Sequence, residues 1–456
     1  MIRLYSLSTV LATVLLFASL PVQGQEQLQL QLQEQKKAAP WTLQQCIEYA
    51  RVHNIEVQTR EVSKAVSDVE LEQTRAQRFP TLNFSSNFGV SFQNTTTYND
   101  FMEQTDAAAY SDNFGLNTGV TLYSGGKINK TIRQKQLNNT ASGYDVDQAL
   151  FDIEISVIQA YLQILYANES YKIAQLAADL SRSQVERGQE MRKAGSMSRG
   201  DLAQLESQAA GDNYQETQTK NALATAKLQL KQLLELDLEE TFEVEFPEID
   251  NYAVLTIIPD LATVYHTALD NLPQMKSSAL GIESAQMDIE IAKASRVPTI
   301  TASASINTGT SSSSGTAYFE QLGTKINENV GLNLSIPIFN NKQVRTNITK
   351  ARLQSRTAEL QDQSTRKQLL STIESLHNNA VSAQSQYISA NEQLKAAQIS
   401  FEVVSEQFQA GLINTIELIT GQNNYTNALS SQLQAKFQAV LAIKLLKLYQ
   451  GQNNEI

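Results

Sequence analysis

The chain has 456 residues, of which 41% are hydrophobic and 18% are charged, and its 47 Asp and Glu outnumber 36 Lys and Arg to give a net charge of −11. This acidic balance argues against nucleic-acid binding, which needs a basic surface. Mean hydropathy is −0.29, and no apolar run of about 18 residues follows the N-terminus, which excludes a helical membrane protein but not a membrane β-barrel. The length suits two or three domains or one large repetitive architecture.

Residues 1–24 have the organisation of a signal peptide. Arg3 supplies a positive charge, Val10 to Leu20 form an apolar segment, and Val22-Gln23-Gly24 fits a cleavage site of small residues. A membrane anchor would need a longer apolar run followed by charges. No cysteine stands at the cleavage site, so lipidation is not expected. We therefore expect export, with the Gln-rich residues 25–40 forming a flexible N-terminal lead.

Two segments of the first half recur 215 to 218 residues later in the same order. They are Arg78-Phe79-Pro80 with Arg296-Val297-Pro298, and Leu122-Tyr123 before Lys127 with Ile338-Phe339 before Lys342. Ordered landmarks at one offset predict two copies of one unit of roughly 200 residues. We place the copies at 41–240 and 259–451, with a linker at 241–258 and a tail at 452–456.

Each predicted unit contains two segments in which apolar residues alternate with Asn, Ser, Thr and Gly. They span about 81–92, 113–123, 299–307 and 329–339, which is the length and alternation typical of membrane barrel strands. A soluble sandwich would need several more strands. The polar connections 93–112 and 307–328 resemble the long loops on the outer face of such a barrel. We expect five even-numbered residues to face lipid: Phe84, Phe88, Leu116, Leu332 and Leu334.

The rest of the sequence predicts helices, two of them very long. Residues 127–194 and 341–410 contain no proline, and each predicts a rod about 100 Å long. Apolar residues recur at alternating spacings of four and three, as in Ile373, Leu376, Ala380 and Ala383, which predicts left-handed supercoiling. Shorter helices at 55–78 and 198–236, and at 272–296 and 414–449, are long enough in pairs to lie end to end beside each rod. Segments 41–53, 237–258 and 260–271 would form a belt near the middle.

The predicted strands also indicate an oligomer. Four strands cannot close a membrane barrel, and open sheet edges are not tolerated in lipid. Identical chains must therefore supply the missing strands. Three chains give twelve strands, an even number within the range that such barrels use.

Together these features resemble the TolC-like outer membrane factor family, over roughly residues 41–451. The resemblance adds two further landmarks, Trp41-Thr42-Leu43-Gln44-Gln45-Cys46 at the start and Gln407-Phe408-Gln409-Ala410-Gly411 followed by Glu417-Leu418-Ile419. It implies an α+β membrane protein, a homotrimer whose 12-stranded outer-membrane β-barrel continues into a long periplasmic α-helical barrel. It also implies a passive exit duct of a tripartite efflux pump or type I secretion system. The implied partners are outer-membrane lipid, a periplasmic adaptor and an inner-membrane pump.

The turns after the two rods contain the candidate site residues. Gly195 and Gly411 fit C-cap glycines, and Asp201 and Glu417 fit acids in the first turn of the return helices. By resemblance, Asp201 and Glu417 also match acidic residues facing the pore mouth, which three chains would turn into a ring of carboxylates. Both interpretations stay open. The resemblance also matches Phe408 to an aromatic position near that mouth, and it maps the adaptor-docking turns onto Gly195-Ser196 and Gly411-Leu412.

The match to the family is incomplete at this site, because Thr420 and Ile413 stand where the family has further charged partners. The sequence contains no cluster of metal ligands, nucleophile motif or phosphate-binding loop, so we predict no enzyme activity, cofactor or metal. Cys46 is the only cysteine and predicts a buried, inert thiol, and His377 lies within a rod. The alternative function is a periplasmic structural coiled-coil protein without a pore.

Overall fold

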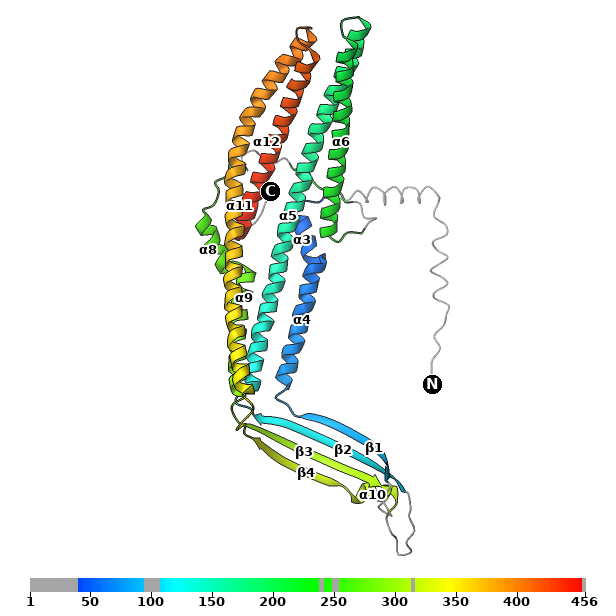
Figure 1. Cartoon of the computed structure of the whole chain (residues 1–456), viewed down its shortest axis with the longest axis vertical. Helices are drawn as coiled ribbons and strands as arrows, with labels where there is room; N and C mark the ends of the chain where they lie inside the picture. The colour runs from blue at the N-terminus through cyan, green and yellow to red at the C-terminus, as the bar shows by residue number, and fades with distance from the viewer. Residues whose placement is uncertain (1–39, 94–106, 238–241, 248–253, 313–315, 453–456) are drawn as a thin grey trace, which may run out of the picture.

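The computed structural model describes residues 40–93, 107–237, 242–247, 254–312 and 316–452. The predicted signal peptide, nearly all of the predicted N-terminal lead and most of the predicted C-terminal tail lie outside these residues. In the described part, long helices lie side by side at one end of an elongated molecule and a four-stranded sheet forms the other end (Figure 1).

The two halves of the chain contain the same series of helices. The first half has α3 (Leu43–His53), α4 (Ile55–Ala76), α5 (Lys127–Lys193) and α6 (Arg199–Leu233), and the second has α8 (Leu261–Asn271), α9 (Pro273–Ala294), α11 (Gln343–Gln409) and α12 (Thr415–Tyr449). In each half these helices have 11, 22, 67 and 35 residues. The two rods therefore have the length that their lack of proline predicts.

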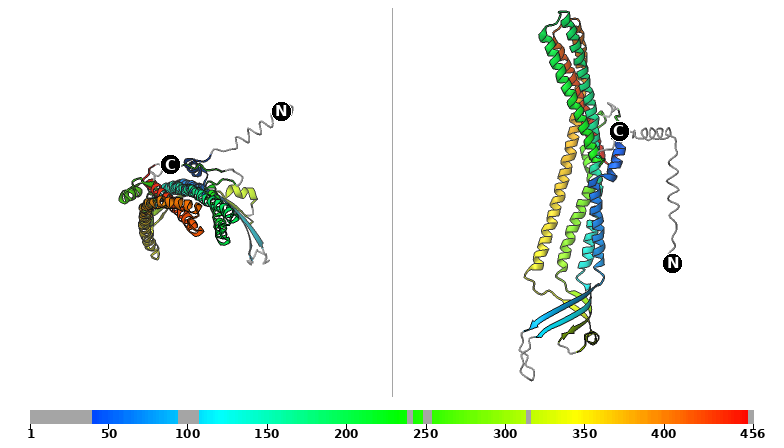
Figure 2. Two further views of the ribbon diagram at one scale, coloured as in Figure 1. Left: turned by 90° about the horizontal axis from the view of Figure 1, so that it is seen from above. Right: turned by 90° about the vertical axis from the view of Figure 1, so that its right-hand side faces the viewer.

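Each rod is accompanied by two shorter helices. Helices α4 and α6 pack along α5, and α9 and α12 pack along α11, while α9 also contacts α5 and so joins the two halves. Seen from above, the helices form an open, curved layer (Figure 2). The end-to-end arrangement expected from the helix lengths is present.

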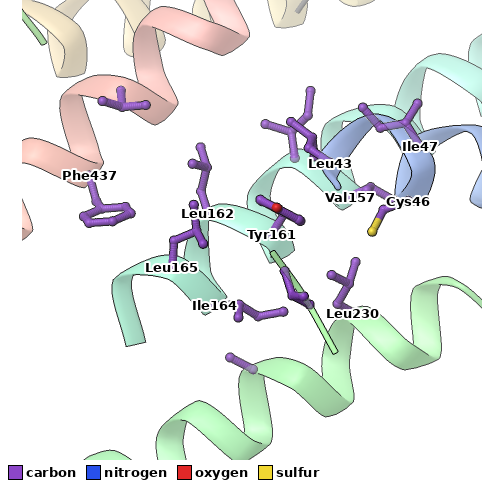
Figure 3. Close-up of a cluster of buried hydrophobic side chains, with 14 of the residues drawn as sticks. Leu43, Cys46, Ile47, Val157, Tyr161, Leu162, Ile164, Leu165, Leu230 and Phe437 are labelled. Carbon is purple, nitrogen blue, oxygen red and sulfur yellow. The ribbon is translucent and has the colours of Figure 1, made fainter. Parts of the chain in front are cut away.

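The main core lies where α3, α5 and α6 meet in the middle of the molecule (Figure 3). Val157, Ile158 and Tyr161 of α5 are fully buried there against Cys46 of α3 and Leu230 of α6. The Tyr161 hydroxyl donates to the Glu245 carbonyl oxygen at 2.8 Å, so its polar atom is satisfied. Burial raises the pKa of the Cys46 thiol to about 12, which keeps it protonated and matches the inert thiol predicted from the sequence.

The expectation that no apolar run of about 18 residues follows the N-terminus is wrong. Within the described residues, α5 contains an 18-residue stretch with a mean hydropathy of 1.3, long and apolar enough to cross a membrane by length and composition alone. Half of that stretch is buried inside the chain. The same helix supplies Val157, Ile158 and Ile164 to the core, so packing between helices accounts for its apolar character.

The sheet contains β1 (Thr81–Gln93), β2 (Ala107–Tyr123), β3 (Thr299–Ser311) and β4 (Asn327–Ser335), all antiparallel and in chain order. Its register places Leu116 opposite both Phe84 and Ile306, and Asn117 opposite both Asn83 and Ser305. Since neighbouring residues of a strand point to opposite faces, one face is apolar and the other carries amides, hydroxyls and glycines.

The largest differences from the predicted strand bounds lie at three strand ends. Strand β2 begins at Ala107 and β3 continues to Ser311, so both are longer than expected. Strand β4 ends at Ser335, because Pro337 has no N–H for the ladder. The second polar connection, which the sequence predicts as a long loop, contains a short helix, α10 (Tyr318–Thr324), and this helix packs on β3. Most of the first connection lies outside the described residues.

Candidate functional site at the helical tips

Both rods end in the same backbone turn, at the end of the molecule opposite the sheet. Gly195 and Gly411 have φ angles of +76° and +74°. The N–H of Ser196 donates to the carbonyl oxygen of Met191 at 2.9 Å, and the N–H of Leu412 donates to that of Gln407 at 2.9 Å. This is the Schellman pattern, which needs a left-handed residue and so favours glycine. The predicted C-cap glycines are confirmed.

The return helices begin with matching N-caps. The Ser198 hydroxyl accepts from the N–H of Asp201 at 3.0 Å, and the Asn414 side-chain oxygen accepts from the N–H of Glu417 at 2.9 Å. The Asn414 amide also donates to the Glu417 carboxylate at 2.9 Å. Both acids therefore lie in the first helical turn, where negative charge is favoured by the helix dipole.

The two acids remain available to solvent. Glu417 is exposed and Asp201 is partly exposed, and neither forms an ion pair with any described residue. The two acids occupy equivalent positions in the α5–α6 and α11–α12 hairpins. The tips of these hairpins lie side by side in Figure 1. The position in the caps is thus established, and a pore-facing role stays a prediction.

The other predicted residues divide into an interior and an exposed group. Phe408 is only 5% exposed and packs with Leu205, Phe401 and Leu418 in a small core that joins α6, α11 and α12. In contrast, the turn residues Gly195, Ser196, Gly411 and Leu412 are exposed. The structure therefore places Phe408 behind the turns, where it holds the hairpins together, and leaves the turns themselves free for contact.

A buried polar network below the tips was missed by sequence reasoning. The Ser181 hydroxyl of α5 donates to the Asp212 carboxylate of α6. The Gln422 amide of α12 lies 2.9 Å from the Ser181 hydroxyl and 3.2 Å from the Asp212 carboxylate. Gln208 of α6 bridges Asp212 and Asn423 at 3.0 and 3.1 Å. These bonds connect the two helical hairpins. The sequence signal that could have revealed this network is the presence of polar residues in an otherwise apolar helical stripe.

At the opposite end, the polar face of the sheet carries no charged residue along the described strands. Its rows consist of side chains such as Asn83, Asn117, Ser305 and Asn329, paired across all four strands. A hollow of about 490 Å³ lies over this face and has Lys325, beside α10, as the one charged residue in its wall. Among the described residues, no group of three or more His, Cys, Asp and Glu could hold a metal ion.

Comparison with known proteins places these features in a family. A model described as "Outer membrane efflux protein" matches residues 46–235 and 264–452. Alkaline protease secretion protein AprF of Pseudomonas aeruginosa is 24% identical over 270 residues, which are 58% of this chain and 54% of that protein. Pyoverdine export outer membrane protein OpmQ of the same organism is 24% identical over 364 residues, 78% of this chain and 71% of that protein.

The fold has close counterparts among solved structures. The outer membrane protein VceC from Vibrio cholerae superposes with a TM-score of 0.74 at 16% identity, and the match covers 91% of this chain and 97% of that one. The chain therefore shares its fold with a protein of similar size over 91% of its length, while the sequence match to AprF spans about half the length of that protein.

Proposed function

The chain belongs to the outer membrane efflux protein family, as its sequence landmarks indicate, and on this premise we propose that it is an outer-membrane exit duct. Three chains would join their sheets into a 12-stranded β-barrel and their curved helical layers into a periplasmic α-helical barrel. Solutes would pass through this channel passively, without enzymatic chemistry. A periplasmic adaptor and an inner-membrane pump would deliver them.

The amphipathic sheet is the observation that carries this proposal. Its even-numbered face exposes large apolar side chains, of which Leu332 is 74% and Phe84 is 70% exposed. An apolar patch of this kind is unstable in water but suited to lipid. Strands β1 and β4 form the edges of the sheet, and edges inside a membrane must be paired. Pairing β1 of one chain with β4 of the next closes the barrel.

The helical layer supports the same assembly. It is curved and open, so copies related by rotation can continue it into a tube (Figure 2). The equal helix lengths in the two halves and the two matches to one family model support a duplicated unit, which gives the tube six equivalent hairpins from three chains. A solitary coiled-coil protein without a pore, the alternative function, offers no role for the apolar sheet face.

At the tips, we propose that Asp201 and Glu417 form a carboxylate ring at the periplasmic mouth. Their positions in matching caps, exposed for Glu417 and partly exposed for Asp201, support this role. The exposed turns Gly195-Ser196 and Gly411-Leu412 would receive the adaptor. Phe408 would act from the interior by fixing the position of the α11–α12 turn. The cargo stays open, because the relatives are named for cargo as different as a protease and pyoverdine.

Membrane fractionation and channel recording test the proposal together. Purified protein should migrate as a heat-dissociable trimer, should be recovered with outer membranes, and should give discrete conductance steps in planar lipid bilayers. A Leu332→Arg variant, whose charge would lie on the lipid face, provides the matched control and should lose trimer and conductance together. A soluble periplasmic monomer with no conductance would favour the structural coiled-coil function instead.

A further inference from the structure

The junction between helices and sheet has a charge opposite to that of the whole protein. Four segments, 75–80, 123–133, 289–298 and 336–345, connect α4, α5, α9 and α11 to the strands, and we call them together the junction belt. The belt contains one acid, Glu290, and nine basic residues: Arg75, Arg78, Lys127, Lys130, Arg133, Lys293, Arg296, Lys342 and Arg345. This excess occurs in a chain whose net charge is −11.

The four segments lie at one level of the molecule. Strand pairing aligns their ends, since Tyr123 lies opposite Ile300 and Thr299 opposite Ser335. The Lys130 ammonium lies 3.5 Å from the Glu290 carboxylate, and Arg78 donates to Asn129 at 2.9 Å. In Figure 1 this level is the narrow zone where the helices give way to the strands. The basic residues therefore lie at one level of the chain.

Internal contacts do not account for the positive charge. Glu290 pairs with Lys130 and Lys293, whereas Lys127, Arg296 and Lys342 are exposed and form no ion pair within the described chain.

Helix dipoles do not account for it either. They favour cations at the C-termini of α4 and α9, but α5 and α11 begin here, and cations are disfavoured at helix N-termini. Lys127 and Lys342 lie at the positive ends of these two helix dipoles, which is unfavourable for a cation. An anion from outside the chain would stabilise this arrangement.

The same segments expose large apolar side chains. Phe339 is 82% and Ile338 is 95% exposed, and Phe79 beside Arg78 is exposed as well. Aromatic side chains next to Lys and Arg are typical of the level at which a membrane meets water. Below the belt, the even-numbered sheet face is apolar, as the hydrocarbon region requires.

We propose that the junction belt binds the phosphate groups of anionic phospholipids in the leaflet nearest the helices, and so fixes the depth of the channel in the membrane. This inference rests on the proposed placement of the strands in the outer membrane. Arg supplies paired N–H donors to phosphate oxygens, and Lys supplies a point charge. Exposed Phe79 and Phe339 bury their rings among the adjoining acyl chains.

Native mass spectrometry of the full-length trimer tests the belt. The trimer is incubated with equal amounts of phosphatidylglycerol and phosphatidylcholine, and the retained lipids are counted. The belt variant combines Lys127→Gln, Arg296→Gln and Lys342→Gln. The control variant combines Arg187→Gln on α5, Lys220→Gln on α6 and Lys367→Gln on α11, all at exposed residues of the same charge outside the junction belt. The wild type should prefer phosphatidylglycerol, and the preference should fall about fivefold for each belt charge removed.

Added salt should weaken the preference of the wild type, and the control variant should keep it. Equal preference in the belt variant and the wild type would overturn the proposal, as would an equal loss in the control variant. Phosphatidylglycerol should also raise the midpoint of thermal unfolding of the trimer, and inorganic phosphate at the same concentration should not. An equal rise with inorganic phosphate would assign the belt to free anions instead of lipid. If the triple variant fails to assemble, the single variants Lys127→Gln and Arg296→Gln are measured instead, and each should lower the preference for phosphatidylglycerol about fivefold. Conductance of the wild type tests the duct separately from the belt.

Discussion

The pair Asp201 and Glu417 allows the proposed mouth to be tested without disturbing the fold. Asp201→Asn together with Glu417→Gln removes two carboxylates per chain and six per trimer, while the N-caps Ser198 and Asn414 remain in place. Each lost interaction with a helix dipole costs about 0.3–1 kcal/mol. The trimer should therefore still assemble, and any change in ion flow can be assigned to charge.

The expected size of the electrostatic effect can be estimated by placing the carboxylates of the proposed ring at an assumed distance of about 8 Å from the pore axis. At about 8 Å from the pore axis, one unit charge in water contributes roughly 0.5 kcal/mol to the energy of a passing ion. Six such charges, reduced by screening at 0.15 M salt, leave roughly 1 kcal/mol, which enriches cations about fivefold at the mouth. At 1 M salt the screening length falls to about 3 Å and the enrichment nearly disappears.

Reversal potentials in planar bilayers under a salt gradient measure this selectivity directly. The wild type should be cation-selective at low salt and nearly unselective at high salt, and the double variant should be unselective at both. A control with Glu61→Gln and Glu374→Gln removes the same charge from exposed sites on α4 and α11 away from the turns, and it should behave as the wild type. An unaltered reversal potential in a correctly assembled double variant would leave both acids as helix caps alone.

Three further predictions concern stability. Gly411→Ala should lower the stability of the tip by about 1 kcal/mol in thermal unfolding, because its φ of +74° strains any side chain, whereas Gly281→Ala inside α9 should be neutral or stabilising. Leu332→Arg should cost about 2–4 kcal/mol and reduce the yield of heat-dissociable trimer. Asn333→Arg on the other face should assemble normally, and the opposite result for the two variants would show that the lipid face is misassigned. Cys46 should resist thiol reagents in the folded state. The folded pKa of Cys46, about 12, lies above its unfolded value. The contribution of the buried thiol to the free energy of unfolding should therefore be fully present below pH ~8.5 and decline as pH rises toward 12. Cys46→Ala should remove this dependence of stability on pH.

The sequence predicts the long-range plan because each element is bounded by a strong local signal. The glycines Gly195 and Gly411 mark the rod ends, and the alternation in 81–92 fixes which residues share a face. Strand β2 is harder, since Ala107, Ala108 and Ala109 do not alternate and become strand by pairing with β1. Helix α10 has seven residues, too few for a helical period to stand out.

The polar network at the tips shows where sequence reasoning reaches its limit. Ser181 and Gln422 are 1% exposed each, yet they occupy positions that a helical period assigns to the core. A period of 3.6 residues identifies the buried face of one helix, but it does not indicate which side chains of three helices meet. The partly buried Asp212 is stabilised because Ser181, Gln208 and Gln422 all donate hydrogen bonds to its carboxylate. Such a bond network requires one relative position of the two hairpins, so the tip that contains the proposed mouth is held by polar contacts that only the folded chain brings together.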